Sequence, residues 1–350
     1  MQVINYTIYG DNPYHEALYS GLTGRYEPAK GDIDLAVTQI ENEGKKIFHI
    51  HWEEHCLRLC ATKSEARSVS EYFVERCRHF KKAGGKIVWT MHNLMPHELE
   101  HPDIFLGLRR SIVEMADRVL IHNLEALKIL HEQAAPNPTK VYYLPHPSYL
   151  GVYEASERTR SRSDAPTRPR TVQAFGMVRR YKGLDGLLDN LPPSFTENHG
   201  IDLRISGQPL PTDNYAHELA AKCETRSDVD LDFRKVPSEE VPDLLRQAGC
   251  VVLPYERFLT SGVALLCLSV GAPAVAPDTP PMRELFPAVA HRLLYKAGDM
   301  DDFRRAIVEA IDLSSEERAN IVSAYLKRAE YLRPERISGQ LGKIYDALVN

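Results

Sequence analysis

The feature that most constrains the fold is a regular alternation of short apolar runs, rich in Val and Ile, with longer amphipathic stretches. Runs of the first kind are typical of buried strands, and the longer stretches are typical of surface helices. In the first half the predicted strands are 2–9, 45–50, 85–91, 118–123 and 140–145, and the predicted helices include 66–83 and 103–116. Strands that alternate with helices favour βα units and parallel sheets. The sequence therefore predicts an α/β protein.

The second half repeats this alternation beyond a polar segment. Its predicted strands are 171–176, 201–207, 229–233, 250–254 and 273–277. Residues 154–170 have almost no large apolar side chains and contain two prolines, so they predict a linker or long loop. A chain of 350 residues is long enough for two domains. We expect an N-terminal domain at 1–153, a C-terminal domain at 171–333 and a helix at 334–350 that packs back towards the N-terminal domain.

Composition and charge exclude several classes of protein. The net charge of −5 argues against nucleic-acid binding, because such proteins are basic overall. No apolar run reaches the roughly 18 to 20 residues that span a bilayer, and the first ten residues lack the basic region of a signal peptide. The six cysteines form no C-x-x-C pair, which is typical of reduced packing residues. These features predict a cytoplasmic protein.

One segment departs from the overall charge. Residues 55–86 contain eight Lys or Arg against three Asp or Glu, a local excess of +5. The simplest interpretation is a solvated helix face. The alternative is peripheral contact with an anionic membrane at the inner face of the cell membrane, where each basic residue contributes about 1 kcal/mol.

The motif FGMVRRYKG carries the strongest chemical signal. It directly follows a predicted strand, and ligands of open α/β sheets bind outside the carboxyl ends of strands. Gly176 lets the chain turn close to a ligand, and Gly183 opens a helix whose N-terminus attracts anions. Arg179, Arg180 and Lys182 bring positive charge to the strand end. This combination predicts a phosphate site, although a surface turn with solvated basic residues is the alternative.

A second anion site is predicted at the start of a long apolar helix. Thr260, Ser261 and Gly262 precede that helix, so their backbone N–H groups and two hydroxyls suit phosphate oxygens. Ser or Thr at this place also serves as an ordinary helix cap. Two anion sites on one sheet indicate a diphosphate.

These motifs carry a family resemblance. The second half, with FGMVRRYKG, LRISGQP, TSG, GAPAVAP and MREL in order, resembles the nucleotide-sugar domain of GT-B glycosyltransferases near family 4. The first half, with NPYHEALYSGL, HIHWEEH, WTMHNLMPHE, ADRVLIHN and LPHPSY, is similar to bacterial exopolysaccharide β-1,4-mannosyltransferases of the xanthan-assembly type. The resemblance implies two Rossmann-like domains with parallel sheets facing across a cleft.

The resemblance also implies a reaction. The C-terminal domain is expected to bind a nucleotide-diphosphate sugar, GDP-mannose or a UDP-sugar, without a cofactor or metal. The N-terminal domain is expected to hold a glycan acceptor, free or linked to polyprenyl diphosphate. Sugar transfer would then serve bacterial polysaccharide assembly. A retaining family 4-like transferase and a non-catalytic sugar-nucleotide-binding partner of another transferase are the alternatives.

Carried over by position, the resemblance assigns donor contacts. Lys182 and an arginine bind the diphosphate; the usual position of that arginine is Met177 here, and Arg179 is the substitute. The two glutamates of retaining family 4 enzymes would fall at Phe258 and Leu266, so the pair is missing. This argues for inversion. The predicted nucleotide- or sugar-binding residues are Val236, Tyr255, Glu256 and Glu284.

An inverting transfer needs a base on the acceptor side, because the attacking hydroxyl must lose a proton. Candidates after the strand ends are Asp11, Glu53, Glu54, His92, His97 and Glu98. Glu53 is preferred because it follows the strand that ends near His51, and His92 is the second predicted catalytic residue. Asn12, Trp52 and Asn93 are predicted acceptor contacts, with Trp52 stacking on a sugar ring. A rim charge, a packing tryptophan or a structural histidine is the alternative for each.

The heptapeptide HIHWEEH also fits the H-x-x-E-H pattern of a zinc protease family through His51, Glu54 and His55. In such sites the two histidines lie one turn apart on a helix. Here the preceding KKIFHI predicts a strand, and no residue stands out as a third ligand. The pattern is therefore interpreted as a coincidence, and no metal is predicted.

Overall fold

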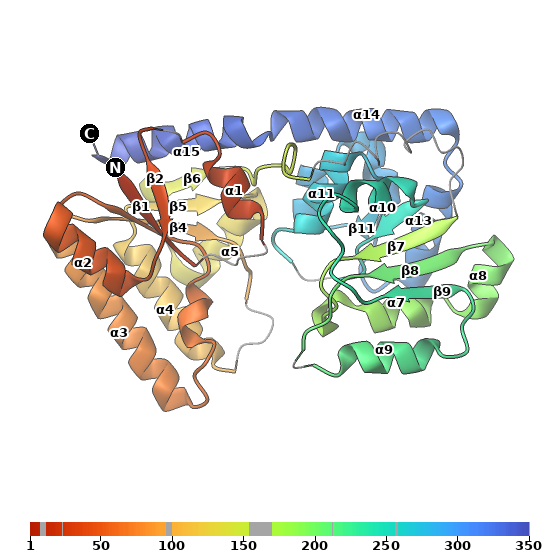
Figure 1. Cartoon of the computed structure of the whole chain (residues 1–350), viewed down its shortest axis with the longest axis horizontal. Coiled ribbons are helices and arrows are strands. Elements are labelled where there is room, and N and C mark those ends of the chain that lie inside the picture. Colours follow the sequence, from red (N-terminus) through yellow and green to blue (C-terminus); the bar gives the residue numbers. More distant parts are fainter. Residues whose placement is uncertain are drawn as a thin grey trace. The chain divides into compact units, whose positions relative to one another are not determined.

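The computed structural model describes residues 1–7, 12–22, 24–95, 100–153, 170–211, 213–255 and 258–349. The chain divides into two compact units. Unit 1 comprises Met1–Pro147, Phe258–Thr260 and Pro334–Asn350, and unit 2 comprises Ser148–Arg257 and Ser261–Arg333. Each unit contains one six-stranded sheet (Figure 1). All but the last residue of the predicted linker at 154–170 lie outside the described part of the chain.

The sheet of unit 1 is parallel throughout, in the order β2-β1-β3-β4-β5-β6. Its strands are β1 (Gln2–Tyr6), β2 (Glu27–Lys30), β3 (Ile47–Ile50), β4 (Lys86–Met91), β5 (Arg118–Ile121) and β6 (Val141–Tyr143). The strand order reverses between β1 and β3. Ligands of open α/β sheets bind at the carboxyl ends of strands beside such a reversal. The flanking strands are β1 and β3, and β4 is the next strand beyond β3.

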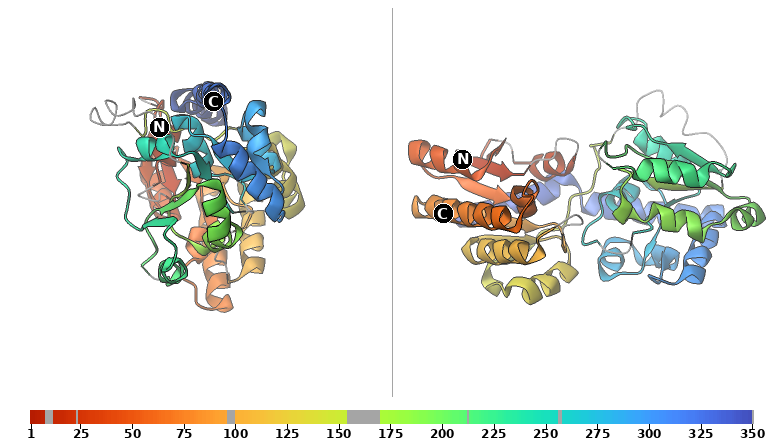
Figure 2. Two further views of the ribbon diagram at one scale, coloured as in Figure 1. Left: turned by 90° about the vertical axis from the view of Figure 1, so that its right-hand side faces the viewer. Right: turned by 90° about the horizontal axis from the view of Figure 1, so that it is seen from below.

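Helices cover both faces of this sheet (Figure 2). The first face carries α1 (Tyr14–Tyr19) and α15 (Pro334–Val349), which pack on each other. The second face carries α2 (Ile33–Glu43), α3 (Lys63–Lys82), α4 (Pro102–Met115) and α5 (Leu124–Ala134). The short helix η1 (Glu53–Leu57) lies between β3 and α3 in the chain and contacts α3 and α4. Buried Phe48, Phe80 and Trp89 lie in the core beneath this second layer.

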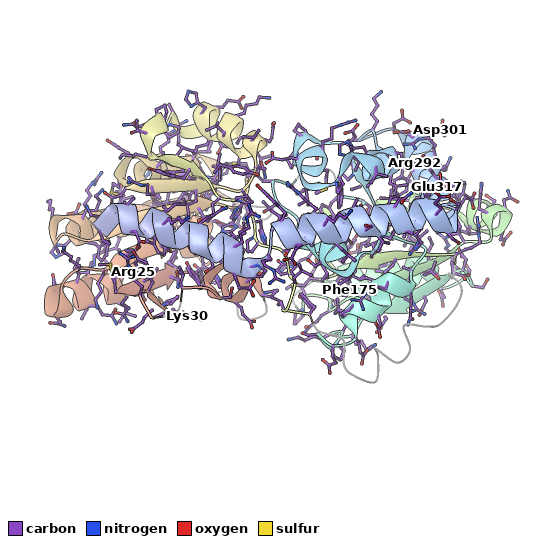
Figure 3. All side chains as sticks on the ribbon, turned by 90° about the horizontal axis from the view of Figure 1, so that it is seen from above. Arg25, Lys30, Phe175, Arg292, Asp301 and Glu317 are labelled. Atoms are coloured by element: carbon purple, nitrogen blue, oxygen red, sulfur yellow. The ribbon has the colours of Figure 1, made fainter. Side chains whose placement is uncertain are left out.

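The C-terminal helix α15 is attached to unit 1 by polar contacts as well as by packing. The Ser338 hydroxyl accepts a hydrogen bond from the Gly21 N–H at 2.9 Å. Arg25 pairs with Asp346 at 2.8 Å, and Figure 3 shows Arg25 beside α15. The Tyr26 hydroxyl donates to the same carboxylate at 2.6 Å. The helix predicted at 334–350 is therefore part of the N-terminal unit.

The sheet of unit 2 is also parallel, in the order β12-β11-β10-β7-β8-β9. Its strands are β7 (Thr171–Phe175), β8 (Asp202–Ser206), β9 (Val229–Asp232), β10 (Cys250–Val252), β11 (Ala274–Pro277) and β12 (Leu294–Tyr295). The order reverses between β7 and β10, so the segments after these two strands flank the expected ligand position.

Eight helices and two short helical turns of the described residues accompany this second sheet. They are η3 (Arg180–Lys182), α7 (Leu184–Asn190), α8 (Pro193–His199), α9 (Tyr215–Cys223), α10 (Val241–Gln247), α11 (Gly262–Val270), α12 (Pro280–Leu285), η4 (Ala288–Leu293), α13 (Met300–Ile311) and α14 (Ser315–Tyr331). Most of α11 is buried, and it packs against α14. This explains why its sequence is apolar all round.

The basic segment at 55–86 forms the end of η1, all of α3 and the first residue of β4. Some of its cations are neutralised by acids of neighbouring elements: Arg76 contacts Asp34 at 2.6 Å, and Lys81 contacts Asp117 at 3.1 Å. Membrane contact through this segment stays a prediction. Among the described residues, no helix combines the length and the apolar character needed to cross a bilayer.

Candidate functional site

The loop after β7 places an ammonium group directly over a glycine. Gly176 has a φ of +103°, and a β-carbon there would lie 2.6 Å from the Nζ atom of Lys182. Burial, with a smaller effect of Arg179, lowers the pKa of Lys182 to about 8. Lys182 therefore stays largely protonated at pH 7. The turn ends at Gly183, whose φ of +65° opens α7.

A second glycine makes this loop compact. Gly207 follows β8 with a φ of +153°, and a β-carbon there would lie 2.0 Å from the backbone oxygen of Gly176. The Gly176 N–H also donates to the Ser206 oxygen at 3.0 Å. The two loops therefore touch through their backbones, and any side chain at Gly207 would separate them.

The N-terminus of α11 meets the same loop. A β-carbon on Gly176 would lie 3.5 Å from Cγ2 of Val263, in the first turn of α11. The Ser261 hydroxyl caps this helix by accepting from the Ala264 N–H at 3.2 Å, and it is also hydrogen-bonded to Tyr255. Positive charge and a helix N-terminus therefore converge on Gly176, which is the arrangement that binds phosphate.

In unit 1, the carboxylate of Glu53 lies in a buried ion pair. Its oxygens accept from Trp89 Nε1 at 3.0 Å and from Arg109 Nε at 2.8 Å, and the Arg109 Nη2 atom lies 2.7 Å away. Glu53 is 1% exposed and Arg109 is fully buried. Arg109 also donates to the backbone oxygens of Leu94 and Asn93. Both carboxylate oxygens of Glu53 are therefore occupied inside the protein.

The neighbouring Glu54 has a different environment. Its Oε1 atom accepts from Asn93 Nδ2 at 2.7 Å, whereas Oε2 is enclosed without a hydrogen-bond partner among the described residues. Burial, and then the charge of Glu53, raise the pKa of Glu54 to about 7.

Aromatic side chains form a dense cluster at the carboxyl ends of the unit 1 strands. Neighbouring ring centroids lie between 4.0 and 6.3 Å apart. The cluster comprises Tyr14, His15, Tyr19, His49, His51, Trp52, His92, His122, His146 and Tyr345. Among the residues that the structure describes, no group of three or more His, Cys, Asp or Glu is arranged to hold a metal ion.

The histidines of this cluster are neutral. Burial lowers the pKa of His15 and of His122 to about 4, and that of His146 to about 3. Burial, followed by neighbouring histidines, also lowers the pKa of the other three; these are His49, His51 and His92. Nδ1 of His122 lies 2.7 Å from the Leu144 oxygen and must donate to it, so Nε2 accepts from the Tyr14 hydroxyl at 3.1 Å.

Comparison with known proteins assigns the C-terminal half. Residues 155–328 match the family described as Glycosyl transferases group 1. The C-terminal half carries a glycosyl transferases group 1 domain. A GDP-mannose:glycolipid 4-beta-D-mannosyltransferase of Xanthomonas campestris pv. campestris is 26% identical over 271 residues, which cover 76% of this chain and 70% of that protein.

Two solved structures show the same fold. A sucrose-phosphate synthase from Thermosynechococcus elongatus has a TM-score of 0.78 at 13% identity, covering 99% of this chain and 98% of that chain. Anabaena Alr3699/HepE in complex with UDP and glucose has a TM-score of 0.67 at 14% identity, covering 99% and 100%. With the two parallel sheets, these similarities establish a GT-B fold of two Rossmann-like domains.

Within the glycosyl transferases group 1 domain, the structure brings together Gly176, Lys182 and the start of α11 at Gly262. Arg179 is half-buried beside Lys182 and affects its pKa, whereas Arg180 is exposed and paired with Glu218 at 2.5 Å. Their role in diphosphate binding stays a prediction. Gly207 was missed as a site residue, although a glycine directly after a strand was an available signal.

The other predicted donor residues occupy varied positions. Val236 is half-buried between β9 and α10, and Tyr255 is 7% exposed. Glu284 is half-buried on α12, where its backbone oxygen accepts from Arg328 at 2.9 Å. Glu256 lies outside the described residues.

Thr260 has a contact that the sequence did not indicate. It belongs to unit 1, where its hydroxyl donates to the backbone oxygen of His92 at 3.3 Å. The preceding Leu259 is buried in the unit 1 core, and its oxygen accepts from Asn123 at 2.7 Å. Only Ser261 and Gly262 of the predicted Thr-Ser-Gly site belong to unit 2.

The structure corrects the preferred base. Glu53 follows β3 as predicted, but its ion pair with Arg109 leaves no free oxygen for an acceptor hydroxyl. The candidates Asp11, His97 and Glu98 lie outside the described residues. Glu54 and His92 are the candidates that the structure describes and that keep an unpaired basic atom.

The predicted acceptor residues have intramolecular contacts of their own. Trp52 is 8% exposed and stacks on His92, with centroids 4.3 Å apart and planes inclined by 20°. The Asn12 side chain accepts from the Tyr14 N–H at 3.0 Å at the start of α1. Asn93 donates to Glu54. One face of Trp52 is therefore covered by the histidine ring.

Proposed function

We propose that this protein transfers a hexose from a nucleotide-diphosphate sugar, GDP-mannose or a UDP-sugar, to a glycan hydroxyl with inversion. The observation that carries the proposal is the convergence of Lys182 and the N-terminus of α11 on Gly176. The match of residues 155–328 to a glycosyltransferase family supports it. The name of the similar mannosyltransferase includes GDP-mannose, and the HepE structure contains UDP and glucose, which supports a GDP-sugar or a UDP-sugar as donor.

In this reaction the acceptor oxygen attacks the anomeric carbon of the donor sugar. The bond from that carbon to the diphosphate oxygen breaks, and nucleoside diphosphate leaves with the bonding electron pair. Lys182, Arg179 and the N–H groups at the start of α11 stabilise the charge that develops on the diphosphate. These groups act where other transferases use a metal ion.

Inversion is proposed because Phe258 and Leu266 occupy the positions of the glutamate pair of retaining relatives. The glycolipid 4-beta-D-mannosyltransferase similarity is consistent with a β-linked product. We further propose that the acceptor is a glycan, free or linked to polyprenyl diphosphate, in polysaccharide assembly at the inner face of the cell membrane. The glycolipid named for the similar mannosyltransferase supports a glycan acceptor. Unit 1 is proposed to hold it, near Asn12, Trp52 and Asn93.

The test uses a panel of GDP-mannose, UDP-glucose and UDP-glucuronate, with binding measured by calorimetry and turnover by nucleotide release. Lys182→Met should weaken binding of the accepted donor about 10- to 100-fold, because a charge-assisted contact of about 1.5 to 3 kcal/mol is lost. Arg180→Met is the matched control, since Arg180 is exposed and paired with Glu218. It should bind the donor like the wild type.

NMR of the product's anomeric proton then distinguishes inversion from retention. Failure of every nucleotide sugar to bind contradicts the proposal. Binding without turnover on any glycan acceptor indicates instead a non-catalytic sugar-nucleotide-binding partner.

A further inference from the structure

A chain of hydrogen bonds in unit 1 connects β1, α1, β3 and β4. The Tyr19 hydroxyl donates to the Oδ1 atom of Asn5. The same hydroxyl oxygen lies 2.8 Å from Nε2 of His51, and Nδ1 of His51 lies 3.1 Å from Nε2 of His92. Nδ1 of His49 also lies 3.0 Å from the Tyr19 oxygen, on a side branch that continues to the Tyr345 hydroxyl. Asn5 and His51 are almost completely buried. The order along the chain is therefore Asn5, Tyr19, His51 and His92.

The position of each proton follows from counting donors. Tyr19 has one hydroxyl proton, and Asn5 receives it, so Nε2 of His51 must donate to the Tyr19 oxygen. A neutral imidazole carries one N–H, so Nδ1 of His51 is an acceptor. The bond between the two histidines then requires that Nε2 of His92 donates. His92 is left with an unprotonated Nδ1.

That nitrogen keeps a lone pair that can accept a hydrogen bond. Nδ1 of His92 has no hydrogen-bond partner among the described residues, and the ring is 5% exposed. Both ring nitrogens of His15, by contrast, are enclosed without partners. Trp52 stacks on one face of His92, and Tyr14 packs edge-on at 4.7 Å. The ring is therefore fixed in position with its lone pair available.

We infer that Nδ1 of His92 accepts the proton of the attacking acceptor hydroxyl, and that Tyr19 and His51 are positioning residues that hold His92 in the required tautomer. This inference rests on the proposed function. The hydroxyl proton moves to Nδ1 while the oxygen bonds to the anomeric carbon. His92 becomes an imidazolium whose Nε2–H still donates to His51, and the proton passes to water after the product leaves.

Geometry selects His92 over Glu54. The unpaired oxygen of Glu54 is enclosed, so an acceptor hydroxyl cannot reach it without rearrangement. Its other oxygen is occupied by Asn93. A general base must first lie within hydrogen-bond distance of the proton that it accepts, and only then does its pKa matter.

The kinetic test compares two Tyr→Phe variants of the full chain. Tyr19→Phe removes the group that orients His51, so kcat should fall about 10- to 100-fold, in the range of a general-base contribution, with the donor KM unchanged. Tyr26→Phe is the matched control, since it also loses a hydroxyl hydrogen bond in unit 1, to Asp346, outside the chain of four residues. Its kcat should equal that of the wild type.

A double mutant shows whether Tyr19 acts through His92. His92→Gln should reduce kcat at least as strongly as Tyr19→Phe while donor binding persists. Adding Tyr19→Phe to His92→Gln should then change kcat by less than twofold. A further tenfold loss in the double mutant overturns the inference, and so does a Glu54→Gln variant that loses turnover while His92→Gln keeps it.

The tautomer is measured independently of activity. In protein labelled with ¹⁵N-histidine, long-range ¹H–¹⁵N spectra report which ring nitrogen carries the proton, and the His92→Gln spectrum identifies the His92 signals. The wild type should show the Nε2–H tautomer and Tyr19→Phe a mixture. A wild-type Nδ1–H tautomer overturns the inference. If donors bind and the tautomer is as expected but no sugar is transferred, the base role is overturned together with the proposed reaction.

Discussion

At the scale of single residues, the buried charge of Glu53 is compensated by several donors at once. An isolated carboxylate in this position would cost several kcal/mol, whereas Arg109 and Trp89 satisfy both of its oxygens. Arg109 additionally holds the backbone after β4 through Asn93 and Leu94. The pair therefore fixes the segment that carries His92, without being free to take part in proton transfer.

Breaking this pair should destabilise unit 1. Glu53→Gln and Arg109→Met are each expected to lower its free energy of unfolding by about 3 to 5 kcal/mol, because one buried group loses its partner. Both tryptophans of the chain, Trp52 and Trp89, lie in unit 1, so urea denaturation followed by tryptophan fluorescence reports on this unit.

The double variant Glu53→Gln, Arg109→Met provides the control. It should lose clearly less stability than the sum of the two single losses, because no unpaired charge remains. Additive losses would show that the ion pair contributes little. If folded Glu53→Gln loses turnover at a temperature well below its unfolding midpoint while its stability is unchanged, the structural assignment of Glu53 is wrong.

At the scale of elements, the strands were predictable because each contains β-branched residues, and several end in Gly or Pro. Two strands escaped prediction for physical reasons. β2 (Glu27–Lys30) is an edge strand with the polar sequence EPAK and mostly exposed side chains, and β12 comprises only two residues. β2 lacks the apolar residues of a buried strand, and β12 is too short to show an apolar run of strand length.

Some features of the candidate site could also be predicted from the sequence, and others could not. The Gly176 loop could be predicted because its glycines and cations are contiguous in sequence. The partners of Glu53 could not, since Trp89 and Arg109 lie 36 and 56 positions away. The hydrogen bonds that orient His92 join Asn5, Tyr19 and His51 only through the strand order β1-β3-β4.

The contact between the ends of β7 and β8 permits a test at this scale. Gly207→Ala should lower the unfolding temperature of unit 2 by several degrees and weaken donor binding, because its β-carbon would lie 2.0 Å from the Gly176 oxygen. Calorimetry measures both effects. Gly186→Ala in α7 is the control, since a β-carbon there has no neighbour within 4 Å and alanine favours a helix by about 0.5 to 1 kcal/mol.

An unchanged transition and unchanged donor affinity in Gly207→Ala would show that the two loops separate at no cost. A loss in Gly186→Ala equal to that in Gly207→Ala would point to general intolerance of unit 2 instead of a specific contact.

At the scale of the whole molecule, the buried histidines make the two units differ in their response to acid. The six histidines of the aromatic cluster all belong to unit 1; they are His15, His49, His51, His92, His122 and His146. Their folded pKa values are lowered, whereas an unfolded histidine titrates near 6.5. Glu54 acts in the opposite direction, because its raised pKa of about 7 favours protonation of the folded state.

Unit 1 should therefore lose stability as the pH falls from about 6.5 towards 4. Above pH 6.5 the histidines are neutral in both the folded and the unfolded state. The stability of unit 1 is therefore not reduced by their protonation in that range. Below it the unfolded chain binds protons that the folded unit excludes. A histidine with a folded pKa of about 4, such as His122, costs about 2 kcal/mol at pH 5, from 1.36 kcal/mol per pH unit.

Tryptophan fluorescence in urea at pH 7, 6 and 5 measures this loss, because both tryptophans report on unit 1. His122→Gln should be less stable than the wild type at pH 7, yet its stability should fall less steeply, by about 2 kcal/mol between pH 7 and pH 5. The exposed His131 on α5 provides the control, and His131→Gln should keep the wild-type slope. Parallel slopes for the wild type and His122→Gln would mean that His122 takes up its proton in the folded unit as readily as in the unfolded chain, which would contradict a lowered pKa. At pH 5 its Nε2 would then donate to Tyr14 instead of accepting.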